Sequence, residues 1–495
     1  MMNGTLLQSF HWYTEGNGQL WKTLAGKAAD LKQKGITAVW LPPAYKGANG
    51  GFSVGYDTYD LFDLGEFDQK RSIPTKYGTK DEYLAAIEAL HQQGIAVYID
   101  AVLNHKMGGD EEETVKLVRV EENNRLEKVG ETFTGKAFTK FTFPGRNKKY
   151  SDFIWDFQCF SGIDYITDEN GNGTTGVFSI QNQYGDSWDE NVSEENANYD
   201  FLMGDDIDFR NPAVRQHLKD WIKWYQQLAH FEGIRLDAVK HINAGFFNEW
   251  IDYIKSEVRG DCFFVGEYWT YNHPELVAYI DSTEGRMHLF DAPLINNFHT
   301  ASREKNNYDL TEIFNHTLVQ SHPDLAVTLV ANHDTQPLQA LENPVEPWFK
   351  PLAYALILLR EKGYPCVFVP DIYGANYTDK GHDGSDVDIF LPVVHKINEL
   401  MTARQLFAYG EQIDYFDHSN CIAWRRTGDG EQEGCIAIIS NGEEGFKEIE
   451  LGESFAEAVF IDFLKNRAEE IQLDKFGKGT FFVNSGSVSV WVRKK

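Results

Sequence analysis

The sequence is poor in cysteine, with only five in 495 residues, at positions 159, 262, 366, 421 and 435. Their number is odd and no two of them form a CxxC pair. The sequence therefore gives no sign of a disulfide framework, and a reducing compartment is the simplest interpretation.

Long apolar runs are also missing. The longest one, Leu352 to Leu359, is far shorter than the roughly 20 residues that a membrane-spanning helix needs. The segment Thr5 to Phe10 already has the pattern of a strand, and no charged segment followed by an apolar stretch precedes it. We therefore expect a cytoplasmic protein that has no membrane partner.

Basic residues are outnumbered by acidic ones, 46 to 75, which gives a net charge of −29. Such a charge repels polyphosphates, so nucleic acid and anionic membrane surfaces are not expected partners. A neutral polymer is unaffected. Aromatic residues, in contrast, are abundant at 14%. Composition leaves open whether these rings fill a large core or also stack on the apolar faces of sugars.

Strand-like apolar runs recur along most of the chain, with helical patterns between them. Near-continuous apolar runs are expected of parallel strands that are buried on both faces. Eight such runs in series favour an α/β fold, a (β/α)₈ TIM barrel, over an open sheet. The predicted strands are residues 5–10, 37–42, 95–102, 233–239, 262–269, 286–292, 325–332 and 366–373.

Start and stop signals bound the predicted helices. Residues 79–93 open with Thr79-x-x-Glu82, a capping box, and stop at Gly94. Residues 211–229 open with an Asn-Pro pair, an N-cap followed by proline at the first helical position. A third helix is predicted over residues 347–362.

Two segments depart from the barrel pattern. About a hundred residues after the third strand have no long helical pattern, which indicates an irregular, β-rich inserted domain. Near the end of the chain, short strands with a hairpin signal at residues 484–486 predict an antiparallel β-sandwich. We therefore divide the chain into a barrel (residues 1–105 and 209–395), an inserted domain with a metal site (106–208) and a C-terminal domain (396–495).

Polar clusters fall where four of the predicted strands end, the place where barrel enzymes carry their chemistry. Arg235 and Asp237 are two residues apart on one strand, so both side chains point to the same face. A buried carboxylate is costly unless it is paired, and Arg235 is the natural partner that keeps Asp237 ionised. Taken alone, this could be a structural ion pair.

Glu267 lies between Val265 and Trp269, in less polar surroundings that should raise its pKa, as a general acid requires. Two carboxyl groups in opposed environments are the pattern for cleavage of glycosidic bonds. A third acid, Asp334, follows a later strand and could bind sugar hydroxyls and help to keep Glu267 protonated.

Four motifs carry a resemblance to the α-amylase family of glycoside hydrolases. They are DAVLNH (100–105), GIRLDAVKH (233–241), VGEYW (265–269) and LVANHD (329–334), in the order of the family. The segments at 55–70 and 198–209 resemble the bacterial liquefying type, and the chain is most similar to intracellular bacterial α-amylases. The resemblance covers essentially the whole chain.

The resemblance implies that the protein hydrolyses internal α-1,4-glucosidic bonds of starch, glycogen and maltooligosaccharides with retention of configuration. It also implies a role for particular residues of these motifs. Asp237 would be the nucleophile, Glu267 the acid and base, and Asp334 the stabiliser of the transition state. The residues implied to contact substrate are Tyr56, His105, Arg235, Lys240 and His333.

The family also implies a structural calcium ion that joins the barrel to the inserted domain. Calcium prefers several oxygen ligands. The ligands implied by the resemblance are Asn104, Asp200, Asp206 and the backbone carbonyl of His241.

A second, linked metal site would use Asp164, Asp189, Asp200, Asp206 and Asp208. Arg210 occupies a position where the liquefying relatives carry aspartate, which puts this second site in doubt. Chloride is not expected, because residues 335–337 lack the basic residue of chloride-dependent relatives.

Two other functions remain open. A transglycosylase or debranching enzyme of the same family would share the three carboxylates. A catalytically inactive binding member should lack at least one of them, and all three are present. We expect a monomer that acts on an α-1,4-glucan.

Overall fold

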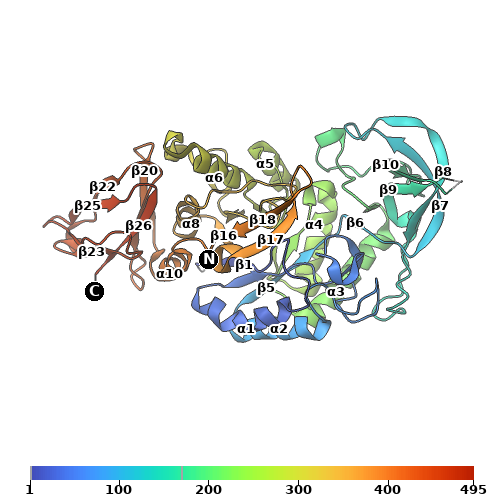
Figure 1. Ribbon diagram of the computed structural model, residues 1–495, viewed down its shortest axis with the longest axis horizontal. Coiled ribbons are helices and arrows are strands. Elements are labelled where there is room, and N and C mark those ends of the chain that lie inside the picture. Colours follow the sequence, from blue (N-terminus) through green and yellow to red (C-terminus); the bar gives the residue numbers. More distant parts are fainter. Residues whose placement is uncertain (1–2, 169–170, 495) are drawn as a thin grey trace.

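The computed structural model describes residues 3–168 and 171–494. Figure 1 shows three bodies in a row. The barrel lies in the middle, the sheet inserted after its third strand lies at one end, and the C-terminal strands lie at the other end.

The central body is a closed barrel of eight parallel strands in the order β1-β16-β15-β14-β13-β12-β5-β2. The predicted (β/α)₈ fold is therefore confirmed, although most strands are shorter than their apolar runs. The strands are β1 (Leu6–Gln8), β2 (Ala38–Trp40), β5 (Ala96–Ala101), β12 (Gly233–Leu236), β13 (Phe263–Gly266), β14 (His288–Phe290), β15 (Ala326–Leu329) and β16 (Tyr364–Phe368).

One predicted strand is wrong at its end. Residues 369–373 form a short helix, α9 (Val369–Tyr373), rather than the continuation of β16. Pro370 lies in the first turn of this helix, where proline is tolerated because its missing N–H would have no partner within the helix.

The helices that surround the barrel follow the capping signals of the sequence. Thr79 and Glu82 form the predicted capping box, and Asn211 accepts a hydrogen bond from the backbone N–H of Ala213. The third predicted helix forms over fewer residues. The helices are α1 (Leu20–Gln33), α2 (Lys80–Gln92), α3 (Pro212–Ala229), α4 (Ala244–Tyr253), α5 (His273–Ser282), α6 (Ala292–Glu304), α7 (Leu318–Ser321), α8 (Lys350–Leu358) and α10 (Ile397–Phe407).

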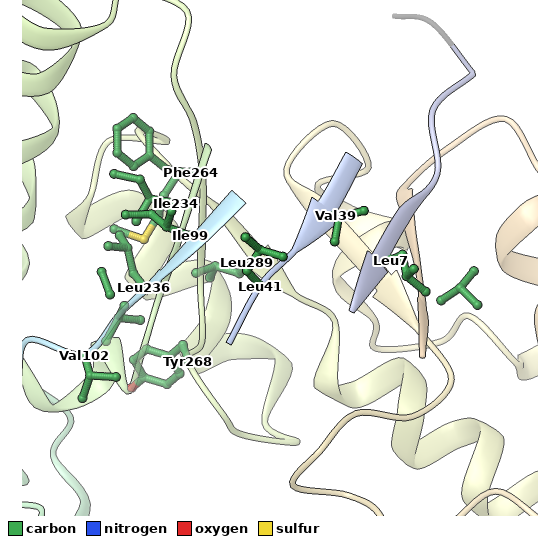
Figure 2. Close-up of a cluster of buried hydrophobic side chains, with 14 of the residues drawn as sticks. Leu7, Val39, Leu41, Ile99, Val102, Ile234, Leu236, Phe264, Tyr268 and Leu289 are labelled. Carbon is green, nitrogen blue, oxygen red and sulfur yellow. The ribbon is translucent and has the colours of Figure 1, made fainter. Parts of the chain in front are cut away.

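The alternation of side chains along the strands builds two apolar layers. Leu7, Val39 and Ile99 belong to the large cluster that includes residues of the surrounding helices (Figure 2). Their neighbours Trp40 and Tyr98 belong to the cluster of the barrel interior. Because successive side chains on a strand point to opposite faces, one short strand serves both layers.

The inserted body is a six-stranded sheet in the order β10-β7-β8-β9-β11-β6. It is more regular than predicted, since β7 and β8 have 10 and 13 residues. Its strands are β6 (His105–Lys106), β7 (Glu111–Val120), β8 (Lys128–Lys140), β9 (Phe160–Thr167), β10 (Gly173–Ile180) and β11 (Asp205–Ile207). The pairing of β6 with β11 places Asp206 beside His105, close to the end of β5.

The C-terminal body is a six-stranded sheet, β19-β20-β21-β26-β23-β24, with the separate pair β22-β25. An apolar cluster joins the two. The strands are β19 (Gln412–Tyr415), β20 (Cys421–Arg426), β21 (Cys435–Ser440), β22 (Gly445–Glu450), β23 (Val459–Asp462), β24 (Ile471–Gln472), β25 (Lys478–Val483) and β26 (Ser487–Arg493). Seven of these strands were predicted, over residues 421–427, 433–440, 446–451, 458–464, 470–474, 480–484 and 487–493; β19 and helix α10 were not. The hairpin predicted at residues 484–486 is wrong, because β25 pairs with β22 while β26 pairs with β21 and β23.

Two general predictions can be compared with the structure. The five cysteines are all free and buried. In the part of the chain that the structure describes, no helix is both long and apolar enough to cross a lipid bilayer.

Candidate active site

Acidic side chains from four strands meet at the C-terminal end of the barrel. Asp100 is the fifth residue of β5, and Asp237 and Glu267 come directly after β12 and β13. Asp334 lies on the loop after β15. The parallel register sets Arg235 level with Asp100 on one side and with Val265 on the other.

The guanidinium group of Arg235 holds this cluster together. One of its terminal nitrogens, Nη1, donates to Oδ1 of Asp237 at 2.7 Å and to Oδ1 of Asp100 at 2.9 Å. The other, Nη2, donates to Oε2 of Glu267 at 2.6 Å. Asp237 and Glu267 therefore lie within a few ångström of each other, which fits the close carboxyl pair of retaining glycosidases.

This arrangement corrects one expectation. Glu267 was expected in surroundings less polar than those of Asp237, but both carboxylates accept a hydrogen bond from the same guanidinium. The two acids differ instead in burial and in their neighbours. Burial, partly offset by Arg235, raises the pKa of Glu267, and the charge of Asp237 raises it further.

The cluster has one cation for four carboxyl groups. If all four were ionised, the buried site would carry a net negative charge, which is costly in a medium of low dielectric constant. Burial and the charge of Glu267 raise the pKa of Asp334 well above its usual range. The shifts at Glu267 and Asp334 both favour the protonated form, the direction that a general acid requires.

Asp100 was not singled out from the sequence, although it opens the first of the four motifs. Its Oδ2 accepts hydrogen bonds from the indole N–H of Trp40 and from the hydroxyl of Tyr56, both at 3.0 Å. Burial raises the pKa of Asp100 to about 7, even though Arg235 acts in the opposite direction. Asp100 thus ties Arg235 to the aromatic wall of the site.

Stacked rings form that wall. The ring of Tyr56 is nearly parallel to those of Trp12, at 5.9 Å and 5°, and His333, at 5.1 Å and 15°, and Trp12 and His333 also stack on each other at 6.2 Å. His333 is fixed through Nδ1 by Gln8 at 2.9 Å, and burial lowers its pKa well below the usual value, so the ring is neutral. The other histidine, His105, bonds to the carbonyl of Tyr56 at 2.7 Å.

Trp12 and Gln8 are further residues that the sequence did not reveal. They belong to β1 and the loop after it, a segment without any of the four motifs. The aromatic run Phe10-His11-Trp12-Tyr13 at the end of the first strand was the signal that could have pointed to them.

Lys240 lies at the border between the barrel and the inserted sheet. Its Nζ donates to both carboxylate oxygens of Glu195 at 3.0 Å and to the carbonyl of Trp269 at 3.2 Å. Glu195 comes from the segment that precedes β11. The lysine is therefore positioned by the inserted body.

The residues expected to bind calcium lie between β6, β11 and the 3₁₀ turn after β12. Asn104 donates to Oδ1 of Asp206 at 3.3 Å, while its own Oδ1 is buried and has no hydrogen-bond partner among the described residues. Oδ2 of Asp200 accepts the backbone N–H of Asp189 at 2.8 Å. His241 bonds through Nδ1 to the carbonyl of Tyr199 at 2.7 Å.

Comparison with known proteins decides the family. The family model described as the alpha-amylase catalytic domain matches residues 11–399. The chain belongs to the alpha-amylase family. It is 54% identical to the cytoplasmic alpha-amylase of Escherichia coli K12 over 99% of both chains. It is also 45% identical to an alpha-amylase of Geobacillus stearothermophilus, over its whole length and 87% of that protein.

Solved structures of the alpha-amylase family share the fold. An alpha-amylase from Anoxybacillus superimposes with a TM-score of 0.65 over 99% of this chain and 97% of that one, at 17% sequence identity. An alpha-amylase from Geobacillus thermoleovorans gives a TM-score of 0.64. At such identities the likeness concerns the fold alone.

At the second metal site that the alpha-amylase resemblance implies, a side chain of the protein, Arg210, supplies the positive charge. The guanidinium of Arg210 donates to both oxygens of Asp208, at 2.8 and 2.7 Å, and Asn182 also donates to that carboxylate. Asp164 accepts the backbone N–H of Gly204 at 2.8 Å. These contacts do not fit a second metal ion.

Over the described ranges, 3–168 and 171–494, no three side chains of the types His, Cys, Asp or Glu are grouped so that they could hold a metal ion. A site at Asn104 would therefore depend on amide and backbone oxygens beside the carboxylates. The buried Oδ1 of Asn104, which has no partner, fits such a site.

Proposed function

We propose that this alpha-amylase family member hydrolyses internal α-1,4-glucosidic bonds of starch, glycogen and maltooligosaccharides with retention of configuration. The observation that carries the proposal is the pair Asp237 and Glu267, held by one guanidinium at the catalytic end of the barrel. Close carboxyl groups favour a covalent glycosyl-enzyme over direct attack by water, which needs a wider separation.

In the proposed mechanism, Asp237 attacks the anomeric carbon while Glu267 donates its proton to the glycosidic oxygen. The C–O bond breaks, the leaving glucan departs with that proton, and a glucosyl ester forms on Asp237. Glu267 then takes a proton from water, the hydroxide attacks the anomeric carbon, and Asp237 is released. Asp334 binds sugar hydroxyls during both steps, and Arg235 orients Asp237 through its hydrogen bond.

The aromatic wall supports binding of a neutral sugar. We propose that Tyr56 stacks under the ring that is cleaved, with His105 and His333 as hydrogen-bond partners of its hydroxyls. Because burial lowers the pKa values of both histidines, they act as neutral groups. Lys240, held by Glu195, would contact the leaving-group side.

We propose a single structural calcium ion held by Asn104, Asp200, Asp206 and the carbonyl of His241. The donor set consists of hard oxygens, and the free Oδ1 of Asn104 supports it. Such an ion would supply positive charge among buried carboxylates where the inserted sheet joins the barrel, and it takes no part in the chemical steps. We do not propose the linked second metal ion, because Asp208, one of its implied ligands, already forms an ion pair with Arg210.

Three further points belong to the proposal. A cytoplasmic location is supported by the name of the Escherichia coli relative and by the free cysteines. We propose that the chain acts as a monomer, without nucleic acid or membrane partners. We also propose the domain limits 1–105 with 209–395, 106–208 and 396–495.

Product analysis tests the reaction. Proton NMR on fresh digests of a maltooligosaccharide should show α-anomers first, and the reducing ends should increase in step with cleavage. Disproportionation without net reducing ends would instead indicate the alternative, a transglycosylase, and cleavage confined to α-1,6 branch points would indicate a debranching enzyme.

The roles of the two acids are tested by substitution. Asp237→Asn and Glu267→Gln should each lower kcat at least ~10³-fold, equivalent to about 4 kcal/mol of barrier. Near-normal turnover of either variant, with an unchanged melting temperature, would remove that residue from the mechanism.

A further inference from the structure

A cavity of about 660 Å³ opens in the C-terminal body, away from the catalytic residues. Helix α10 contributes Leu406 and Phe407 to its wall. The loop between β20 and β21 contributes a large part of the remainder, together with the ends of β20, β23 and β26. None of the residues that line it belongs to the barrel strands or to the catalytic loops. Its size is in the range of small-molecule sites, about 300–1,000 Å³.

Two arginines in this cavity share one aromatic ring. Cζ of Arg425 lies 5.4 Å from the ring centre of Phe455, and Cζ of Arg493 lies 5.8 Å from it. In the described part of the chain, neither guanidinium forms an ion pair or a side-chain hydrogen bond. Their donors are therefore free for a ligand.

Other arginines of the same body show what is unusual about this pair. Arg426, on the same strand, donates to the carbonyls of Gly410 and Leu359, and Arg467 pairs with Glu444 and Glu469. In a chain with a net charge of −29, carboxylate partners are plentiful. Two unpaired guanidinium groups that face one cavity form a local site for an anion.

Acidic residues in the lining of the cavity restrict which anion fits. Glu431 and Glu433 also line it, and one carboxylate oxygen of Glu433 is buried without a hydrogen-bond partner in residues 3–168 and 171–494. These carboxylates repel a ligand that is anionic throughout, but they accept hydrogen bonds from hydroxyl groups. The cavity thus favours a molecule with one anionic end and a hydroxyl-rich body.

We propose that this cavity binds a sugar monophosphate. The phosphate would lie between Arg425 and Arg493, where planar guanidinium groups form paired hydrogen bonds with phosphate oxygens. The sugar would lie against Phe455, with its hydroxyls directed to Glu431 and Glu433. This site is independent of the proposed hydrolysis, and its occupant is not a substrate.

Isothermal titration calorimetry on the full chain tests the proposal with glucose 6-phosphate as the probe. Saturable binding is expected, and it should weaken as salt is added because charge carries much of it. Arg425→Gln and Arg493→Gln should each lower the affinity about tenfold or more, the usual effect of losing a hydrogen bond to a charged group. Arg493 is exposed at the end of its strand, so its substitution leaves folding intact.

Arg467→Gln is the matched control, since it removes an arginine of the same body outside the cavity, and it should keep the affinity of the wild type. Binding should also persist when a maltooligosaccharide fills the catalytic cleft, and both variants should hydrolyse short substrates at the wild-type rate. No binding of glucose 6-phosphate, or equal binding by the double variant, would overturn the proposal. Inorganic phosphate, glucose or adenosine monophosphate binding as tightly as glucose 6-phosphate would overturn the assignment of a sugar phosphate.

Discussion

At the scale of single residues, the properties of the site follow from one guanidinium that serves several carboxylates. Arg235 contacts Asp100, Asp237 and Glu267 and is itself almost fully buried. A buried ion of this kind is stabilised only while its partners are in place. Substitutions next to Arg235 should therefore act on catalysis through its position.

We expect Asp100→Asn to lower kcat by about 10²-fold, because Arg235 loses a charged partner and can move relative to Asp237. KM should change much less, since Asp100 does not face the sugar in the proposed mode of binding. Steady-state kinetics on a maltooligosaccharide measure both parameters. Asp462→Asn, which changes a buried carboxyl group of the C-terminal sheet, should reduce stability without changing kcat; an equal loss of kcat in both variants would contradict the positioning role.

The buried carboxyl group of Asp291 should make the free energy of unfolding depend on pH. The carboxyl group of Asp291 accepts the backbone N–H groups of Leu294, Leu318 and Val319, yet burial raises its pKa from 3.8 to about 6. The folded state therefore holds this proton more tightly than the unfolded chain does. Its contribution to stability falls as the pH rises from about 4 to about 6, by up to about 3 kcal/mol, and is constant above that range.

Asp291→Asn removes that dependence. The free energy of unfolding of the variant, measured by denaturant titration, should improve relative to the wild type between pH 4 and pH 6 by up to about 3 kcal/mol. A difference between the two proteins that stays constant over this range would show that the pKa of Asp291 is not raised.

At the scale of helices and strands, the sequence predicted helix starts correctly where a side chain forms a hydrogen bond with a backbone group nearby in the chain. The capping box before α2 and the Asn-Pro start of α3 formed as predicted, because their partners are only two or three residues away. The hairpin β17 (Ala375–Lys380) and β18 (Asp386–Leu391) was not predicted. In β18 the half-buried residues Val387, Ile389 and Leu391 alternate with exposed ones, a period of two that could have marked this strand, whereas the residues of β17 are mostly polar.

The capping box gives a prediction for this scale. Thr79→Ala should lower the free energy of unfolding by about 1 kcal/mol, because the first turn of α2 loses an acceptor for its free N–H groups. Thr79→Ser keeps the hydroxyl and should retain most of the stability. Urea denaturation of the three proteins measures the effect, and equal losses in the serine and alanine variants would show that the hydroxyl does not act as a cap.

At the scale of the whole molecule, the candidate calcium site lies where the inserted sheet joins the barrel. β6 and β11 pair there, and Asn104 comes directly before β6. An ion at this place would connect the inserted sheet to the barrel, so its removal should loosen the inserted sheet and with it the cleft.

Chelation tests this role. Excess EDTA should lower the melting temperature, by an amount equivalent to about 3–4 kcal/mol if calcium is present at 100–1,000 times its Kd. Restoring calcium should restore the melting temperature. Asn104→Ala should melt at a lower temperature than the wild type and should respond little to EDTA. An unchanged melting temperature of the wild type in EDTA would argue against the structural calcium.

The sequence by itself determined the order of the elements. Apolar runs, caps and turn residues act over a few neighbours, so they identified the eight barrel strands, the long insertion and the C-terminal strands. The motifs also put the right acids at the ends of strands, since a strand fixes which face a side chain occupies.

Only the tertiary structure decided how those acids share their surroundings. The closure of the barrel places one guanidinium within reach of Asp100, Asp237 and Glu267. The ion pair between Arg210 and Asp208 means that Asp208 is no longer available as a ligand of a second metal ion. The tertiary structure also places Arg425 and Arg493 at one cavity, where neither guanidinium forms an ion pair within the part of the chain that the structure describes. These relations depend on distances between residues far apart in the chain, and local patterns carry no information about such distances.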